Sequence, residues 1–312
     1  MDEFVLARIR DRATEEVTSA VAYHTSFDIH HDPSCLRIHI TNGNITHIDH
    51  AREVVVREPD VIAFVEEACR VFPYKEEITC TVAIGLHDTY NKHTSGLLVF
   101  SRHQDARGQI VIPDLYAMQN YGGKLDVIDD VCTTDKIPTA LFVGVTTGDY
   151  DPFNNKRLQL CAWAQHHPNV ATCSISRVVQ IPYHEIKSAY PDCDMFINNE
   201  DMSVAQQHQY KFLISVDGNT CAWDRLPWIL NSKSICLKHE SENIEWYYPL
   251  LQPGVHYIPF ENFDDILQIV QSKKNNTDIV EAANTFVRNY LIRDSHLHYL
   301  GCVLHSLSLG SW

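Results

Sequence analysis

The sequence lacks several features that would assign it quickly to a class. It has no run of 18 apolar residues, the length that crosses a bilayer as a helix. Its start, MDEFVLARIRDRATEEV, is charged and helical in pattern, which predicts no secretory signal. Its ten cysteines occur singly, without a C-x-x-C pair, so neither a disulfide framework nor a zinc cluster is indicated. We therefore expect reduced cysteines, no membrane span and a cytoplasmic location.

Positive charge is also scarce, with 25 Lys and Arg against 40 Asp and Glu and a net charge of −15. This balance argues against a broad nucleic-acid surface and against binding to an anionic membrane. Any anionic ligand must be held by a few local cations. Neither a G-x-S-x-G nor a Walker pattern occurs, which disfavours hydrolase and kinase chemistry.

What is present is ample apolar sequence, 45% of 312 residues, enough for one large domain or two smaller ones. The first half predicts a helix over the first 20 residues, a hairpin around Asn42-Gly43, and strands in ITCTVAIGL, GLLVFSRH and QIVIP. The second half alternates strands (TALFVGV, VATCSIS, YKFLISV, SICLK) with helices (NNKRLQLCAWAQ, SVAQQHQ, CAWDRLPWIL, FDDILQIVQSKK), and two more helices follow over 278–307.

The segment YGGKLDVIDDVCTTDKIP, residues 121–138, has no clear period and is interpreted as a linker. We therefore predict an α/β protein of two domains, residues 1–130 and 131–312, which enclose a cleft. Ligands of such sheets bind outside the carboxyl ends of the strands.

Two predicted strands of the second half end in small polar residues and are followed by a cation. Thr146, Thr147 and Gly148 follow the first strand, and Arg157 lies in the next helix. The second strand is followed by Gly218, by Asn219 and Thr220 in cap position, and by a helix with Arg225. Helix N-termini and arginines together bind phosphates, although each site alone also fits an ordinary turn or a plain N-capped helix. Two such sites on neighbouring strands favour a diphosphate.

Asp88 follows the buried strand TVAIGL in the other half. A carboxylate at that strand end would accept a proton from a hydroxyl nucleophile, and the alternative interpretation is a turn-capping aspartate. Asp149 and Asp151 form a D-x-D, which either chelates a metal or begins the following helix with its acids at the positive end.

Three blocks near the carboxyl end carry a family resemblance: YKFLISVDGNTCAWDRLPWILNSKSICLK, EWYYPLLQPGVHYIPF and FVRNYLIRDSHLHYL. They resemble the CAP10-like glycosyltransferases, glycosyltransferase family 90, which include protein O-glucosyltransferases and capsule xylosyltransferases, with relatives in large DNA viruses. The blocks VAIGLHDTY, LLVFSRH, QNYGG and ALFVGVTTG occur upstream in matching order, so the resemblance covers about residues 80 to 307.

The resemblance implies a GT-B fold, in which two Rossmann-like domains hold a UDP-sugar, and inversion at the anomeric carbon without a metal. Asp88 matches the family's catalytic base. The family often has an arginine where Val143 precedes Gly144 here. The residues expected at the donor are Gly144, Thr146, Thr147, Gly148, Arg157, Gly218, Asn219, Thr220, Cys221, Ala222, Arg225 and Glu245.

The expected reaction is transfer from UDP-xylose, or else UDP-glucose, to a hydroxyl of a glycan or glycoprotein acceptor, with neither metal nor other cofactor. The resemblance to viral members further suggests a host-cytoplasmic enzyme of viral glycoprotein glycosylation. Two alternatives stay open: a metal-dependent enzyme that uses a D-x-D, and a catalytically inactive module that binds sugar or nucleotide.

Overall fold

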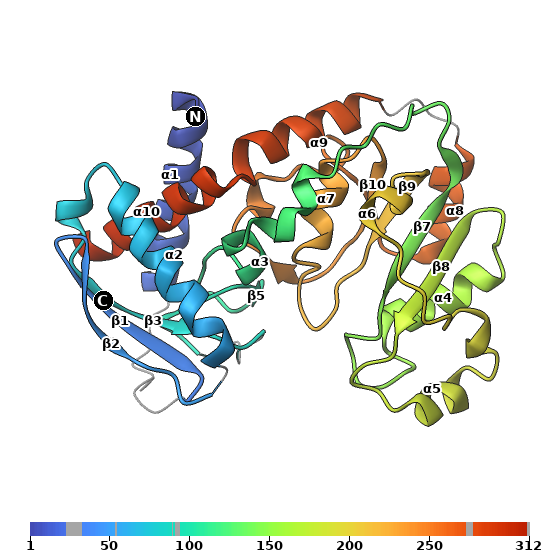
Figure 1. The fold of residues 1–312 in the computed structure, drawn as a ribbon, viewed down its shortest axis with the longest axis horizontal. Helices are drawn as coiled ribbons and strands as arrows, with labels where there is room; N and C mark the ends of the chain where they lie inside the picture. The colour runs from blue at the N-terminus through green and yellow to red at the C-terminus, as the bar shows by residue number, and fades with distance from the viewer. Residues whose placement is uncertain (23–32, 54, 89, 91–93, 273–276, 311–312) are drawn as a thin grey trace. The chain divides into compact units, whose positions relative to one another are not determined.

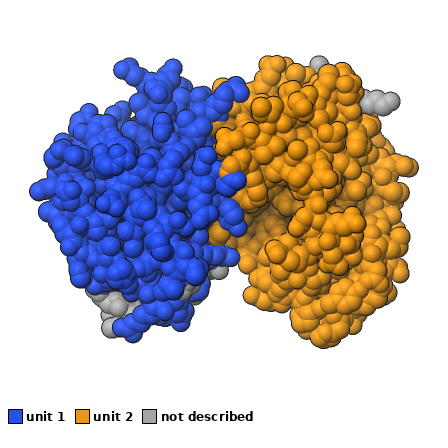
Figure 2. Space-filling model, in the orientation of Figure 1, with its two compact units in different colours: residues 1–122, 242–249, 288–312 blue, residues 123–241, 250–287 orange. Residues whose placement is uncertain are grey.

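The computed structural model describes residues 1–22, 33–53, 55–88, 90, 94–272 and 277–310. The chain forms two compact units, shown in separate colours in Figure 2. Unit 1 comprises residues 1–122, 242–249 and 288–312, and unit 2 comprises residues 123–241 and 250–287. The first crossing between the units, at 122/123, comes eight residues before the predicted boundary at 130/131, and the chain returns to unit 1 twice.

Unit 1 is built on a five-stranded mixed sheet in the order β2-β1-β3-β4-β6. Its strands are β1 (Cys35–Thr41), β2 (Asn44–Asp49), β3 (Cys80–Gly85), β4 (Leu97–Val99) and β6 (Gln109–Val111). The β1–β2 hairpin is the predicted one, and its turn residues Asn42 and Gly43 have φ of 49° and 70°. Both values are positive, as a two-residue hairpin turn of this kind requires.

The helices of unit 1 are α1 (Glu3–Ala22), α2 (Glu58–Val71), α3 (Leu115–Met118) and α10 (Arg293–Leu309), and α1 runs beside α10 (Figure 1). The Tyr299 hydroxyl in α10 donates to the Val111 carbonyl oxygen at 2.9 Å, which ties this carboxyl-terminal helix to the sheet. A second, two-stranded pairing of β5 (Arg102–His103) with β11 (Asn243–Ile244) explains why residues 242–249 belong to this unit.

Unit 2 contains a five-stranded sheet in the order β12-β10-β9-β7-β8, with every neighbouring pair parallel. Its strands are β7 (Ile137–Val145), β8 (Ala171–Arg177), β9 (Tyr210–Ser215), β10 (Ile235–His239) and β12 (Ile258–Phe260). Its helices are α4 (Lys156–Gln165), α5 (Tyr183–Ala189), α6 (Val204–Gln207), α7 (Arg225–Leu230), α8 (Phe263–Gln271) and α9 (Thr277–Tyr290, of which 288–290 belong to unit 1). Because all strands are parallel, their carboxyl ends lie at one edge.

The mixed α/β class predicted from the sequence is confirmed, and most predicted elements are present. The main local error concerns CAWDRLPWIL: the helix was predicted from Cys221, whereas α7 begins at Arg225. Pro227 has no N–H to donate and is accommodated in a first turn, so a helix that began at Cys221 would place it in the interior. Trp223, with φ of 30°, is also outside the helical region. None of the described helices is long and apolar enough to span a bilayer.

Candidate active site

The loop after β7 is held in place by Asn155. This residue is fully buried and caps α4, because its Oδ1 accepts hydrogen bonds from the N–H groups of Arg157 and Leu158, both at 3.1 Å. Its Nδ2 donates to the carbonyl oxygens of Thr146 (3.2 Å) and Asp149 (3.0 Å). One side chain therefore fixes both the start of the helix and the course of the loop that leads to it.

Thr146 lies in this loop but is turned away from solvent, with an exposed fraction of 0%. Its hydroxyl donates to the Val179 carbonyl oxygen and accepts from the Val179 N–H at 2.7 Å. Thr146 thus ties the end of β7 to the segment that follows β8. Its role in the structure is to hold the loop rather than to present a hydroxyl at the edge of the sheet.

Arg157 joins the carboxyl ends of β7 and β9. Its Nε donates to the Asp217 carbonyl oxygen (3.0 Å) and Nη2 to that of Val216 (3.2 Å). Nη1 donates to the Val145 carbonyl oxygen (3.2 Å) and to Thr147 Oγ1 (2.6 Å). Arg157 was predicted from the sequence to bind the sugar donor. In the structure it lies at the predicted strand ends, where all three guanidinium nitrogens bond to unit 2.

Arg225 lies close to Arg157, and both guanidinium groups approach the same ring. The carbon Cζ of Arg225 is 4.8 Å from the centroid of Phe142, and that of Arg157 is 5.9 Å from it. Arg225 donates from Nη2 to the Val143 carbonyl oxygen at 2.5 Å. Since this is the one hydrogen bond that its guanidinium makes to the described residues, most of the five guanidinium donors remain available for a ligand.

Burial lowers the pKa of both arginines. For Arg157 burial is the larger cause and the nearby Arg225 the second, and together they bring the pKa to about 9. The pKa of Arg225 is also lowered, chiefly by burial. At a pKa of about 9, Arg157 remains positive at neutral pH. The positive charge of both groups is poorly solvated, which an incoming anion would relieve.

The carboxylates nearest this pair are engaged elsewhere. Asp217 Oδ2 accepts a hydrogen bond from Ser241 Oγ at 2.7 Å, and Asp224 forms an ion pair with Lys124. Across the part of the chain that the structure describes, neither Arg157 nor Arg225 forms an ion pair with a carboxylate. The edge of the unit 2 sheet therefore carries two desolvated positive charges, which Asp217 and Asp224 offset through space without forming an ion pair with either arginine.

The second strand-end loop approaches the first through Gly218 and Asn219. A side chain at Gly218 would place Cβ 2.7 Å from Thr147 Oγ1 and 3.0 Å from Arg157 Nη2, so only glycine fits.

Asn219 was predicted to cap a helix, but it does not. Its Oδ1 accepts a hydrogen bond from the Gly148 N–H at 3.0 Å. Thr220 was also predicted to cap the helix; instead its Oγ1 accepts a hydrogen bond from Trp223 Nε1 at 3.1 Å. Thr220, Cys221 and Ala222 are buried in this loop, three to five residues before the start of α7.

The D-x-D forms a turn before α4. Asp149 Oδ1 accepts from the Asp151 N–H at 2.9 Å, and Asp151 Oδ1 accepts from the Phe153 N–H at 3.0 Å. The helix itself begins at Lys156, two residues later than the segment NNKRLQLCAWAQ predicted, because Asn155 provides the cap. Within the described ranges, no group of three or more His, Cys, Asp or Glu side chains is placed to hold a metal ion.

Asp88 lies in unit 1, beyond the carboxyl end of β3. Its Oδ1 forms an ion pair with Arg57 Nη2 at 2.7 Å, and its side chain is 32% exposed. The same arginine donates from Nη1 to the Leu86 carbonyl oxygen at 2.8 Å. Ser101 Oγ donates to the Asp88 carbonyl oxygen at 3.3 Å. The carboxylate is thus partly exposed to solvent, and its buried Oδ1 is oriented by the ion pair with Arg57.

Tyr90 supports the same loop. Its hydroxyl accepts from the His87 N–H at 3.1 Å and lies 2.9 Å from Ser34 Oγ. Its ring packs over Gly85, where a Cβ would lie 2.3 Å from the ring, so the last residue of β3 must lack a side chain. The contacts explain how a short segment after β3 is positioned.

Glu245, predicted at the donor, belongs to unit 1, whereas the other predicted donor residues lie in unit 2. Its side chain is 1% exposed, and its carbonyl oxygen accepts from the Tyr248 N–H at 3.1 Å. It precedes the buried Trp246 and Tyr247. It is therefore not brought together with the strand-end loops inside either unit.

Three residues that organise these sites were not found from the sequence: Asn155, Arg57 and Phe142. Asn155 carried a recognisable signal, because an asparagine immediately before a helical pattern is a typical N-cap. Arg57 lies 31 positions from Asp88, and no local pattern links the two. Phe142 reads as one more apolar residue of a buried strand, so its contact with two cations depends on tertiary structure.

Comparison with known proteins identifies the family of this chain. The model of glycosyl transferase family 90 matches residues 129–308, more than half of the chain, and the chain therefore belongs to that family. This stretch includes both strand-end loops of unit 2 and the helix α10 of unit 1.

Three relatives illustrate the range of similarity. Protein O-glucosyltransferase 2 of Danio rerio is 38% identical over 104 residues, 32% of this chain and 20% of that protein. O-glucosyltransferase LpsA of Dichelobacter nodosus is 29% identical over 137 residues, 43% of this chain and 38% of that protein. Uncharacterized protein 035R of Invertebrate iridescent virus 3 is 30% identical over 186 residues, 56% of this chain and 17% of that protein. The matched stretches thus span well under half of each relative.

Proposed function

We propose that this protein is an inverting glycosyltransferase that uses a UDP-sugar and does not need a metal ion. The observation that carries the proposal is the pair of desolvated arginines, Arg157 and Arg225, at the carboxyl edge of a parallel sheet without an ion-paired carboxylate. A diphosphate supplies the missing negative charge. Family membership supports glycosyl transfer as the chemistry, and two relatives are named O-glucosyltransferases.

In the proposed reaction, Asp88 takes the proton from an acceptor hydroxyl. The acceptor oxygen forms a bond to the anomeric carbon as the bond from that carbon to the diphosphate oxygen breaks, and the electron pair leaves with UDP. Attack opposite to the leaving group inverts the configuration. A base held within reach of the nucleophile accelerates such a step by about 10²–10⁴-fold.

Unit 2 stabilises the charge that grows on the leaving group. Arg225 has donors left for the diphosphate oxygens, while Arg157 acts through its fixed, buried charge and by holding the two loops together. Preorganised donors of this kind stabilise a transition state more than a solvated ground state. Gly144, Gly148 and Gly218 keep the chain free of side chains where the loops and Arg225 approach one another.

The donor we propose is UDP-xylose, with UDP-glucose as the second choice, and the acceptor is a hydroxyl of a glycan or glycoprotein. The proposal includes the GT-B arrangement that the family resemblance implies, and a cytoplasmic location. The viral relative gives some support to a role in viral glycoprotein glycosylation.

The test is the release of UDP from a panel of UDP-sugars, with and without EDTA, at equal protein concentrations. Slow hydrolysis of one donor that survives EDTA would support the proposal and identify the sugar. Loss of turnover in EDTA would favour a metal held through Asp149 and Asp151. Binding of UDP without turnover of any donor, with glycan acceptors present, would favour an inactive binding module.

A further inference from the structure

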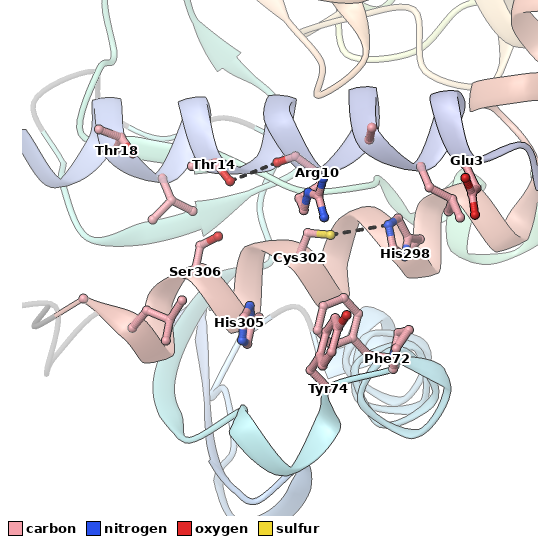
Figure 3. Close-up of a pocket in the computed structure, with 16 residues that line it drawn as sticks. Glu3, Arg10, Thr14, Thr18, Phe72, Tyr74, His298, Cys302, His305 and Ser306 are labelled. Atoms are coloured by element: carbon pink, nitrogen blue, oxygen red, sulfur yellow. Dashed lines mark hydrogen bonds between the residues drawn. The ribbon is translucent and has the colours of Figure 1, made fainter.

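A groove lies in unit 1 between α1 and α10. Its cavity volume is about 940 Å³, at the upper end of the usual range for small-molecule sites. The walls come from one face of α1, one face of α10 and the turn at residues 72–74 that follows α2 (Figure 3). The lining stretch of α1 from Leu6 to Val17 alone extends about 16 Å along the helix axis.

This groove is separate from the candidate active site. The carboxyl end of α10, which forms part of its wall, lies at the amino end of β3, where the Thr79 N–H donates to Ser308 Oγ at 2.9 Å and Cys80 Sγ to the Leu304 carbonyl oxygen at 3.8 Å. Asp88 follows the carboxyl end of the same strand. This part of the groove and the proposed base therefore lie at opposite ends of β3, whose six residues span about 20 Å.

One wall of the groove is aromatic. The His305 ring lies 5.6 Å from that of Phe72 and is stacked with that of Tyr74 at 6.1 Å, and Tyr74 is 56% exposed. The His298 ring lies 5.9 Å from Phe72. These rings, together with aliphatic residues at both ends of the groove, offer apolar contact to a ligand rather than a chain of hydrogen bonds.

The groove carries one positive charge that is not neutralised. Arg10 points from α1 toward α10 (Figure 3), and its guanidinium has neither a hydrogen bond nor an ion pair with any described residue. The groups opposite it are neutral: burial lowers the pKa of His298 and raises that of Cys302 to about 12. Glu3 lies at one end of the groove, so an anion there would be repelled.

We propose that this groove binds an amphipathic organic anion, with one carboxylate or phosphate head group on Arg10 and an apolar body along the aromatic and aliphatic walls. The small side chains of Ala7, Thr14 and Cys302 leave the space that such a body fills. The head group satisfies a guanidinium that has donors to spare, and the thiol and imidazole beside it add no competing charge.

The proposal is tested by calorimetric titration of the full chain with decanoate, decyl phosphate and 1-decanol. We expect decanoate or decyl phosphate to bind at one site with a Kd below about 1 mM, and 1-decanol to bind at least about tenfold more weakly because it lacks the charge. The two anions distinguish a carboxylate from a phosphate head group. Arg10→Gln should weaken binding of whichever anion binds more tightly by about tenfold or more.

Matched controls use neighbouring exposed residues of α1 that do not line the groove. Arg8→Gln should leave anion binding unchanged, and Glu15→Trp should too, whereas Thr14→Trp should block it by filling the groove. Slow UDP-sugar hydrolysis should be the same in all four variants. Equal affinity for 1-decanol, equal loss in Arg8→Gln and Arg10→Gln, or no saturable binding of either anion would overturn the proposal.

Discussion

At the scale of single residues, the hydrogen bonds of a side chain show whether it stabilises the fold or remains available to a ligand. Arg157 and Arg225 are both close to Phe142, but Arg157 bonds through all three nitrogens to the chain while Arg225 donates once. The same residue type therefore has two roles at one edge of the sheet. The hydrogen bonds of the two guanidinium groups distinguish these roles, whereas their closeness to Phe142 does not.

Asp88 is the residue on which the proposed chemistry depends. Replacing Asp88 by Asn keeps the size of the side chain and removes its ability to accept the acceptor proton. We expect transfer to fall by about 10²-fold or more, while the affinity for UDP, measured by calorimetry, stays within about twofold of the wild type. Activity equal to that of the wild type would remove Asp88 from the mechanism.

Arg57 holds Asp88 through the ion pair and the bond to the Leu86 carbonyl oxygen, so it is a positioning residue. Arg57→Met should lower kcat by about tenfold or more, because misplacement of a base by 1 Å costs that much, and should leave KM for the donor unchanged. Arg57→Lys should restore part of the rate, since it keeps the charge.

The control for this prediction is Arg52→Met, an exposed arginine in the same segment. It should leave kcat unchanged. If Arg57→Met and Arg57→Lys lose activity equally while both remain folded by circular dichroism, orientation by charge is not the role of Arg57. If KM for the donor rises instead, Arg57 acts on the donor.

At the scale of elements, the loop after β7 and the helix α4 form one unit through Asn155. Asn155→Ala removes the cap and both Nδ2 bonds, and should lower the free energy of unfolding by about 1–2 kcal/mol. Asn155→Asp keeps the acceptor that caps α4 but loses the donor to Thr146 and Asp149. We expect the Asp variant to retain more stability than the Ala variant, measured by urea denaturation.

Both Asn155 variants should weaken UDP binding, because the loop would lose its fixed course in each. The affinity for UDP thus reports the role of the loop, and the stability reports the role of the helix cap. A variant that loses stability but keeps wild-type affinity for UDP would show that the loop does not need Asn155 to bind the donor.

Elements with strong local signals could be predicted from the sequence. The Asn-Gly hairpin, the apolar strands and the amphipathic helices α8 and α9 all lie where the patterns indicated. The predicted start of α7 at Cys221 was wrong because it followed the apolar spacing of CAWDRLPWIL and did not take Pro227 into account. The missing N–H of Pro227 restricts this residue to the first turn of a helix.

The candidate site was predictable only in part. The strand-end positions of Thr146, Gly218 and Asp88 follow from local patterns, because parallel strands place their carboxyl ends at one edge. The contacts that define roles join distant residues, as Arg57 joins Asp88 and Asn219 joins Gly148. Periodicity carries no information on such pairs, and the Thr146 hydroxyl is directed inward by a contact with Val179 that no local rule foresees.

At the scale of the whole molecule, the proposed function requires an acidic chain with a net charge of −15 to bind an anion through two desolvated arginines. The lowered pKa of Arg157, about 9, gives this site a pH dependence. The protonated form carries the charge that UDP needs, and it is lost as pH rises through about 9. We expect UDP affinity to be steady near neutral pH and to fall above about pH 9.

The same shift in the pKa of Arg157 changes folding stability with pH in the opposite direction to UDP affinity. A cation whose folded-state pKa lies below its unfolded value destabilises the fold while it is charged, and this penalty declines as pH rises through the folded pKa. Calorimetric titration of UDP from pH 7 upward measures the first effect, with high-pH stability of the unliganded protein as the control. Affinity that stays constant well above pH 9 would show that Arg157 does not contribute its charge to UDP binding.

The measurement that tests the central claim most directly is calorimetric titration of the full chain, in EDTA, with UDP and with uridine. The account predicts that UDP binds at least about tenfold more tightly than uridine, that Arg225→Gln removes most of this difference, and that Lys156→Gln, an exposed neighbour of Arg157, does not. Equal affinity for UDP and uridine, or UDP binding that EDTA abolishes, would contradict a diphosphate site formed by the two arginines.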